Sequence, residues 1–146
     1  MFIGEYSHTI DEKGRLALPS KFRAKLADGV VATRGIDRCL FLYTKTEWEA
    51  LAERLAALPI TSKNTRAFAR LMLAGAMELS LDRQGRVVLP EYLRSYAGFK
   101  KSVVVAGLYG RIELWDESAW KKEKAQLEGN SDEIAEQLSE LGVAGV

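Results

Sequence analysis

The stretch IDEKGRLALP fills residues 10–19 of this 146-residue chain, and LDRQGRVVLP fills residues 81–90. The Asp, Gly, Arg and Pro of the first stretch all recur 71 positions later in the second. Each stretch joins a turn signal, D-x-x-G, to a short apolar run that ends at a proline, which cannot donate to a strand ladder. The pattern indicates that a whole structural unit is present twice.

The correspondence between the two copies continues well past the prolines. Gly35 matches Gly107 and Trp48 matches Trp120, now at an offset of 72, which implies one extra residue in the second copy. No flexible Gly/Ser linker separates the copies, so we expect them to pack as one body. The predicted division is residues 1–60 for the first repeat with its helix, 61–76 for a connecting helix, 77–122 for the second repeat, and 123–146 for an acidic tail.

Local patterns predict a strand-rich α+β fold. Residues 5–10 and 76–81 alternate in the manner of half-buried strands, and each run leads through a turn into a second short strand, so each copy is predicted to open with a β-hairpin. The helix 46–58 has Thr46 as its expected N-cap, and Asn130 with Glu133 is the expected capping box of a small tail helix. Further expected elements are short helices at 19–29 and 90–98, strand pairs at 30–43 and 102–115, and a helix at 65–76.

The charge is unevenly distributed along the chain. A formal net charge of +1 combines residues 1–124, with all 21 Lys and Arg against 15 Asp and Glu, and residues 125–146, with five acids and no base. Basic groups gathered on one face can still bind nucleic acid when the total is balanced. No apolar run approaches the roughly 18 residues of a membrane span, and no secretion signal is present, so we expect a cytoplasmic protein with no membrane partner.

The repeated turns contain residues that need no function and residues that suggest one. Asp11 and Asp82 suit turns because a short carboxylate accepts bonds from N–H groups two residues on. Gly14 and Gly85 suit backbone positions with positive φ.

Four basic side chains at the same turns are not explained by turn chemistry. They are Lys13, Arg15, Arg83 and Arg86. A planar guanidinium beside a fixed carboxylate can bind phosphate or the acceptor edge of guanine, although a solvated, ion-paired tip is an equally good interpretation of the residues alone.

Two other classes of function fit the sequence less well. An enzyme is disfavoured because the phosphate-loop, HExxH, CxxC and serine-elbow motifs are missing, and the single His8 and single Cys39 fall in separate apolar strands. We therefore expect no catalytic residue, metal or cofactor. A ring-forming interaction module without specific DNA binding is the alternative, with Leu108 and Tyr109 as candidate subunit contacts.

Five motifs in order and spacing resemble the MraZ family, the two-repeat bacterial members of the AbrB/SpoVT group of DNA-binding transcription regulators. They are MFIGEYSHTIDEKGRLALPSKFR, CLFLY, ARLMLAGA, LDRQGRVVLP and GLYGRIELWDESAW, and they cover about residues 1–122.

The resemblance implies two AbrB/SpoVT-like repeats that form a pseudo-twofold barrel of the swapped-hairpin type. The family pattern D-x-x-x-R falls on Asp11 to Arg15 and on Asp82 to Arg86, in loops that family members use against DNA. It also implies a nucleoid-associated, ring-shaped homo-oligomer. The expected partner is double-stranded DNA, at short direct repeats in the promoter of the division and cell-wall gene cluster that includes the protein's own gene. The loops differ in one respect, since Glu12-Lys13 in the first corresponds to Arg83-Gln84 in the second.

Overall fold

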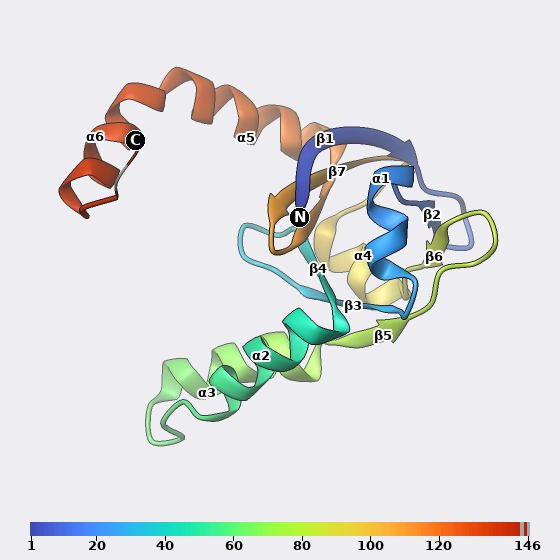
Figure 1. Ribbon diagram of the computed structural model, residues 1–146, viewed down its shortest axis with the longest axis horizontal. Helices are drawn as coiled ribbons and strands as arrows, with labels where there is room; N and C mark the ends of the chain where they lie inside the picture. The colour runs from blue at the N-terminus through green and yellow to red at the C-terminus, as the bar shows by residue number, and fades with distance from the viewer. Residues whose placement is uncertain (144, 146) are drawn as a thin grey trace.

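Strands of both copies join in one six-stranded antiparallel sheet with the order β1-β7-β8-β4-β3-β5 (Figure 1). This computed structural model describes residues 1–143 and 145. Each edge strand pairs with a strand of the other copy, β1 with β7 and β5 with β3, so neither repeat forms its part of the sheet alone. The strands are β1 Phe2–Thr9, β3 Val30–Arg34, β4 Leu40–Thr44, β5 Met77–Leu79, β7 Ser102–Tyr109 and β8 Ile112–Asp116.

A separate two-stranded ribbon joins β2 (Arg15–Ala17) to β6 (Arg86–Val88). Its central pair is Leu16 with Val87, which are equivalent positions of the two repeats. The β4–β8 pairing likewise places Phe41 opposite Glu113, another equivalent pair. A pseudo-twofold axis therefore passes through both pairs, and each repeat supplies the partner that the other needs.

The prediction that each copy opens with a β-hairpin is correct only for the turn, and the pairing of the two flanking strands was predicted wrongly. The first turn is closed by a bond from the Asp11 N–H to the Arg15 carbonyl and by one bridge between Ile10 and Leu16. The two strands then separate, because all eight residues of β1 pair with residues of β7, and β2 pairs with β6. The cross-copy pairing of the swapped-hairpin type is what the structure contains.

The main core lies between the sheet and a layer formed by the ribbon with α1 (Ser20–Arg23) and α4 (Glu91–Ala97). Leu16 and Val87 point inward from the ribbon and are fully buried. The hydrogen-bonded order of the sheet is open, since β1 and β5 do not pair within the described residues. Side-chain packing against the ribbon layer, and not a continuous ladder, completes the barrel-like enclosure. The mixed α+β, two-repeat fold is as predicted.

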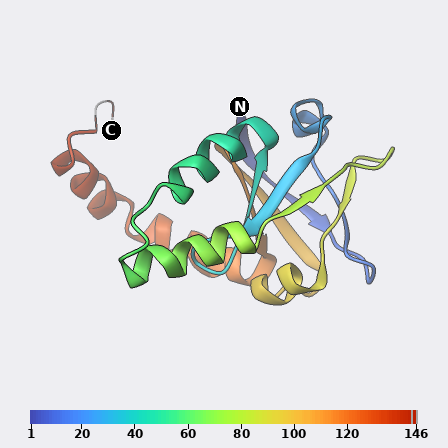
Figure 2. The ribbon, with the colours of Figure 1, turned by 90° about the horizontal axis from the view of Figure 1, so that it is seen from below.

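The other face of the sheet is covered by a second apolar cluster under helices. Residues from β4, β7 and β8 pack there against α2, the connecting segment and the start of α5. The helix α2 (Lys45–Ala56) and the segment α3 (Lys63–Ala69) with η2 (Arg70–Ala74) run side by side away from the sheet (Figures 1 and 2). We call residues 45–74 the helical arm. The remaining helical elements are η1 Ala24–Leu26, α5 Glu117–Gly129 and α6 Ser131–Glu140.

Several helix details differ from the sequence prediction. The N-cap of α2 is Thr44, whose hydroxyl accepts from the Glu47 N–H at 3.1 Å, and not Thr46. Asn130 precedes α6 but makes no side-chain capping bond, so the expected capping box is not formed. The connecting helix ends in the π-helical turn η2. Among the described residues no helix has the length and apolarity needed to cross a bilayer.

Candidate nucleic-acid interface

The loop before β2 is organised by one carboxylate. Asp11 Oδ1 accepts from the backbone N–H of Lys13 at 3.0 Å and of Arg15 at 2.9 Å, while Oδ2 accepts from Arg15 Nε at 2.5 Å. Gly14 closes the turn with φ +83°, in the left-handed region that glycine tolerates. One aspartate thus shapes the backbone and fixes the direction of the arginine side chain.

The loop before β6 repeats this arrangement bond for bond. Asp82 Oδ1 accepts from the N–H groups of Gln84 and Arg86, both at 2.9 Å, and Oδ2 accepts from Arg86 Nε at 2.8 Å. Gly85 has φ +73°. The turn geometry expected of these residues is therefore present in both copies.

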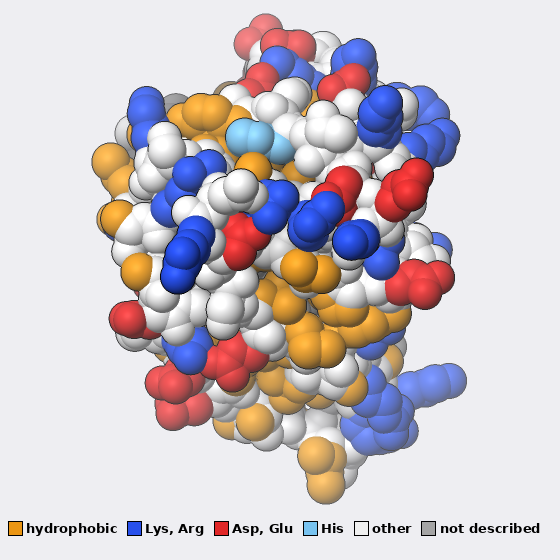
Figure 3. Space-filling view, turned by 90° about the vertical axis from the view of Figure 1, so that its right-hand side faces the viewer, with side chains coloured by type: hydrophobic (Ala, Val, Ile, Leu, Met, Phe, Trp, Pro, Cys, Tyr) orange, Lys and Arg blue, Asp and Glu red, His pale blue; other side chains and the backbone are white. Residues whose placement is uncertain are grey.

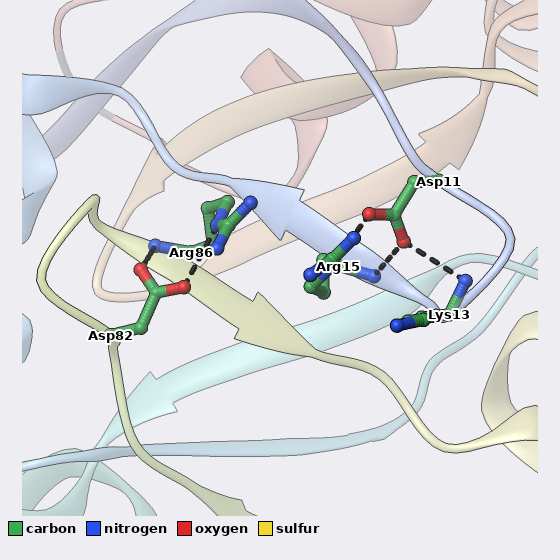
Figure 4. A network of polar contacts seen from close by, with 5 residues as sticks. All are labelled: Asp11, Lys13, Arg15, Asp82 and Arg86. Carbon is green, nitrogen blue, oxygen red and sulfur yellow. Dashed lines mark hydrogen bonds and ion pairs between the residues drawn. The ribbon is translucent and has the colours of Figure 1, made fainter.

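Ribbon pairing brings the two arginines together. Arg15 lies opposite Val88 and Arg86 lies opposite Ala17, so all four side chains share the outer face while Leu16 and Val87 point inward. Figure 4 shows the two guanidiniums next to each other at the centre, with the aspartates flanking them. We call β2, β6 and the two loops at residues 11–15 and 82–86 the arginine ribbon.

The ion pairs with the aspartates use only part of each guanidinium. The side chains of Arg15 and Arg86 remain 37% and 32% exposed. Both use Nε for the aspartate, and their terminal nitrogens make no hydrogen bond to a described residue. Each arginine therefore leaves its two terminal nitrogens free of described partners, and such a pair of donors can bind phosphate or guanine in a bidentate manner.

The aspartates are held in the charged form. The pKa of Asp11 is lowered first by the Arg15 backbone N–H and then by the Arg15 guanidinium. The pKa of Asp82 is lowered in the same way by the backbone and side chain of Arg86. Both ion pairs therefore persist at neutral pH.

A second pair of arginines, which the sequence reading missed, supports the loops from the opposite repeat. Arg23 donates from Nε to the Leu18 carbonyl and lies against Gly85, and Arg94 donates to the Leu89 carbonyl and lies against Gly14. The signal was available, since Arg23 and Arg94 also differ by 71 positions. Each loop is thus in contact with a helix residue of the other copy.

Further basic groups surround the arginine ribbon. Lys13 and Arg83 are exposed at the loop tips, and Lys100 and Lys101 line a hollow beside the first loop together with Arg94. Figure 3 shows Lys and Arg side chains spread over this face, with carboxylates among them and apolar side chains below. The face has the mixed but locally basic character that suits a polyanion.

The single cysteine is buried and the single histidine is half-buried. Cys39 is fully buried, and burial raises the pKa of its thiol. His8 is half-buried on β1, and partial burial followed by the charge of Arg23 lowers its pKa. In the described part of the chain, no three His, Cys, Asp or Glu residues are grouped so that they could hold a metal ion.

Comparison with known proteins decides the family. The profile described as "MraZ protein, putative antitoxin-like" matches residues 1–71 and again residues 72–141. The chain belongs to the MraZ family. Because the second match reaches residue 141, the sequence-based limit of the resemblance at residue 122 was wrong. The tail contains an amphipathic helix but no turn motif, so its similarity to the family was not recognisable from a motif.

Similar MraZ proteins span the full chain. "Transcriptional regulator MraZ" of Caldicellulosiruptor bescii is 48% identical over 143 residues, covering 98% of this chain and 100% of the relative. The proteins of the same name from Halothermothrix orenii and Pediococcus pentosaceus are 48% and 44% identical with the same coverage. The names of these relatives describe regulators of transcription and not enzymes.

Proposed function

We propose that this chain is a transcription regulator that binds double-stranded DNA through the arginine ribbon. The observation that carries the proposal is the pair of guanidiniums on the outer face, each held by an aspartate through Nε while its terminal nitrogens make no hydrogen bond to a described residue. A two-stranded β-ribbon fits the major groove of B-DNA, where such donors can read guanine.

The basic residues have different roles in this proposal. Arg15 and Arg86 read base edges, with roughly 1–3 kcal/mol of discrimination for each good bidentate contact. Lys13 and Arg83, exposed at the loop tips, contact phosphates and set the register of the ribbon on the duplex. Asp11, Gly14, Asp82 and Gly85 hold the loops in shape, as their hydrogen bonds and positive φ values support.

A single ribbon is a small contact, so we propose that several act together. Copies of the chain assemble into a ring, and the ribbons engage short direct repeats in the promoter of the division and cell-wall cluster that contains the protein's own gene. Linked sites can gain on the order of a hundredfold or more over one site when their spacing matches the repeats. The proposed location is accordingly the nucleoid.

The proposal is tested by fluorescence anisotropy with the duplex upstream of the gene, a shuffled duplex, and two salt concentrations. Arg15→Ala and Arg86→Ala should each lower affinity for the native duplex by about 10- to 100-fold with unchanged assembly mass. Equal, weak binding to both duplexes that neither substitution alters would overturn it. That result would favour an interaction module, for which the exposure of Leu108 (40%) and Tyr109 (70%) is the relevant observation.

A further inference from the structure

The tail helix α6 has an apolar stripe with no partner. Ile134, Leu138 and Leu141 lie four and three residues apart, on one side of the helix. Ile134 is 38% exposed and Leu141 is 78% exposed, and neither belongs to a core cluster of the described residues. Nor does any hydrogen bond or ion pair within those residues join α6 to the body.

Such a helix is not expected to be stable by itself. It has 10 residues and no side-chain cap, whereas isolated helices shorter than about 12–15 residues are marginal in water. Its stability must come from burying the apolar stripe against another surface. The charge restricts that surface, because residues 125–146 hold five acids and no base.

The tip of the helical arm has the complementary character. A groove there is lined by apolar side chains that include Leu58, Ile60 and Leu73, together with Arg66. Ile60 is 79% exposed. Residues 54–76, which contain this tip, hold four basic residues and no acid. Lys63 and Arg70 are exposed and lie on one flank of the groove-lining side of α3 and η2.

The two surfaces do not meet within one copy. Trp120 and Lys124 of α5 bond to Glu5 of β1, which fixes the direction in which α5 leaves the body. The 13 residues of α5 then carry the tail helix about 20 Å outward. Figure 1 shows α6 well separated from the arm tip and at the opposite end of the molecule from the arginine ribbon.

We infer that the tail helix docks into the arm-tip groove of a second copy of this chain. The contact joins two different surfaces, so it is head-to-tail and repeats from copy to copy, which closes a ring when the rotation allows. The inference rests on the ring assembly in the proposed function and names the surfaces that build it. Acids beside the stripe, Glu133 and Glu140, then face Lys63 and Arg70 of the neighbour.

The test compares assembly masses of full-length variants by sedimentation velocity across a concentration series. Ile134→Asp with Leu138→Asp should weaken association by at least about 100-fold, because two buried aliphatic side chains are lost. Since α6 makes no core contact, the melting temperature of the dissociated body should be unchanged, which separates loss of docking from loss of folding.

Charge reversal provides a matched pair of variants. Glu133→Lys with Glu140→Lys should weaken association by about 10-fold, whereas Asp132→Lys with Glu136→Lys, an identical charge change on the opposite side of α6, should have little effect. Combining the first pair with Lys63→Glu and Arg70→Glu should restore assembly. Equal effects of the two pairs, or no restoration, would overturn the inference.

Two further outcomes are decisive. A wild-type chain that stays monomeric, or a tail helix that docks on its own arm with unchanged mass, would contradict docking between copies. DNA binding is separable from this result: an assembly-deficient tail variant should still bind a duplex with one repeat, and that binding should still require Arg15. Failure of the docking inference thus leaves the DNA proposal standing, and failure of the DNA proposal leaves docking standing.

Discussion

The two loops of the arginine ribbon share a framework but differ at their tips. In both, an aspartate accepts two backbone N–H groups and one arginine Nε, and a glycine closes the turn. Between these fixed points the first loop carries Glu12 where the second carries Arg83. Duplication has therefore kept what shapes the ribbon, whereas the residues that meet solvent have diverged.

The β4–β8 pair shows the same divergence inside the fold. Glu113 stands where the first copy has Phe41, and it is only 8% exposed. Its carboxylate accepts from Arg111 at 2.8 and 3.1 Å and from the Trp115 indole at 3.0 Å, while the Arg111 guanidinium lies 4.7 Å from the centre of the Phe41 ring. The equivalent positions 41 and 113 thus carry different side chains, and Arg111 contacts both of them at the pseudo-twofold axis.

The largest expected effect on stability comes from removing the Glu113 carboxylate. Glu113→Ala leaves the Trp115 N–H and most of the Arg111 charge without an acceptor, and should lower the free energy of unfolding by about 2–4 kcal/mol. Urea unfolding measures it. Glu78→Ala is the control, because its ion pair with Lys45 is largely exposed and should contribute less than about 1 kcal/mol. Similar losses for both variants would contradict the role given to Glu113.

Replacing the turn glycines compares the loops directly. A Cβ at Gly14 would lie 2.6 Å from the Leu89 carbonyl oxygen, in addition to the cost of positive φ, so Gly14→Ala should destabilise by about 2–3 kcal/mol. Gly85→Ala meets the Arg23 side chain and should cost less, because a side chain moves more readily than backbone. Gly98→Ala, with positive φ but open space, should cost about 1 kcal/mol in thermal unfolding. The reverse order would refute this account of the loops.

Changing the loop tips should alter affinity and salt dependence more than stability. Arg83→Gln should weaken DNA binding and reduce the slope of log K against log salt by about 0.9, which is the loss of one phosphate contact. Glu12→Gln should strengthen binding modestly by removing a repelling charge. Anisotropy titrations at four salt concentrations would measure both, and unchanged slopes would exclude phosphate contact by Arg83.

The smallest expected effect is a change in the pKa of a single loop aspartate. Because the folded pKa of Asp11 and of Asp82 is lowered, their stabilising contribution is present above the unfolded pKa near 3.9 and is lost as pH falls through the folded values. Arg15→Ala should raise the pKa of Asp11 only in part, since the backbone N–H bond remains, and leave that of Asp82 unchanged. Carboxyl NMR titration measures both values, and coupled shifts would contradict independent loops.

Local features of the fold were predictable from the sequence, but strand partners were not. The D-x-x-G turns and the short helices after each proline follow from residues within a few positions. The pairing of β1 with β7 depends on a partner about 100 residues away, which alternation cannot specify. The resemblance to the MraZ family supplied the swapped arrangement that local patterns had assigned to hairpins.

The same limit applies to the candidate site. The arginines beside the turns were identifiable because a tight turn has no need of guanidinium. Arg23 and Arg94 share the 71-residue spacing, but they were overlooked because their contact with a loop of the other copy is visible only in the three-dimensional structure. Thr44 replaced Thr46 as the cap of α2 because β4 continues to Thr44, which places the helix start two residues earlier.

The most direct test of the central claim is protection of the ribbon face by DNA. Val88 lies opposite Arg15 and two residues from Arg86 on the outer face of the ribbon, whereas Ile36 lies in the β3–β4 turn away from the ribbon, and both side chains are 54% exposed. Val88→Cys and Ile36→Cys can be alkylated with a maleimide while Cys39 stays buried. Saturating duplex should slow alkylation at position 88 and leave position 36 unaffected. Protection at position 36 alone, or at neither, would contradict the arginine ribbon as the DNA-binding surface.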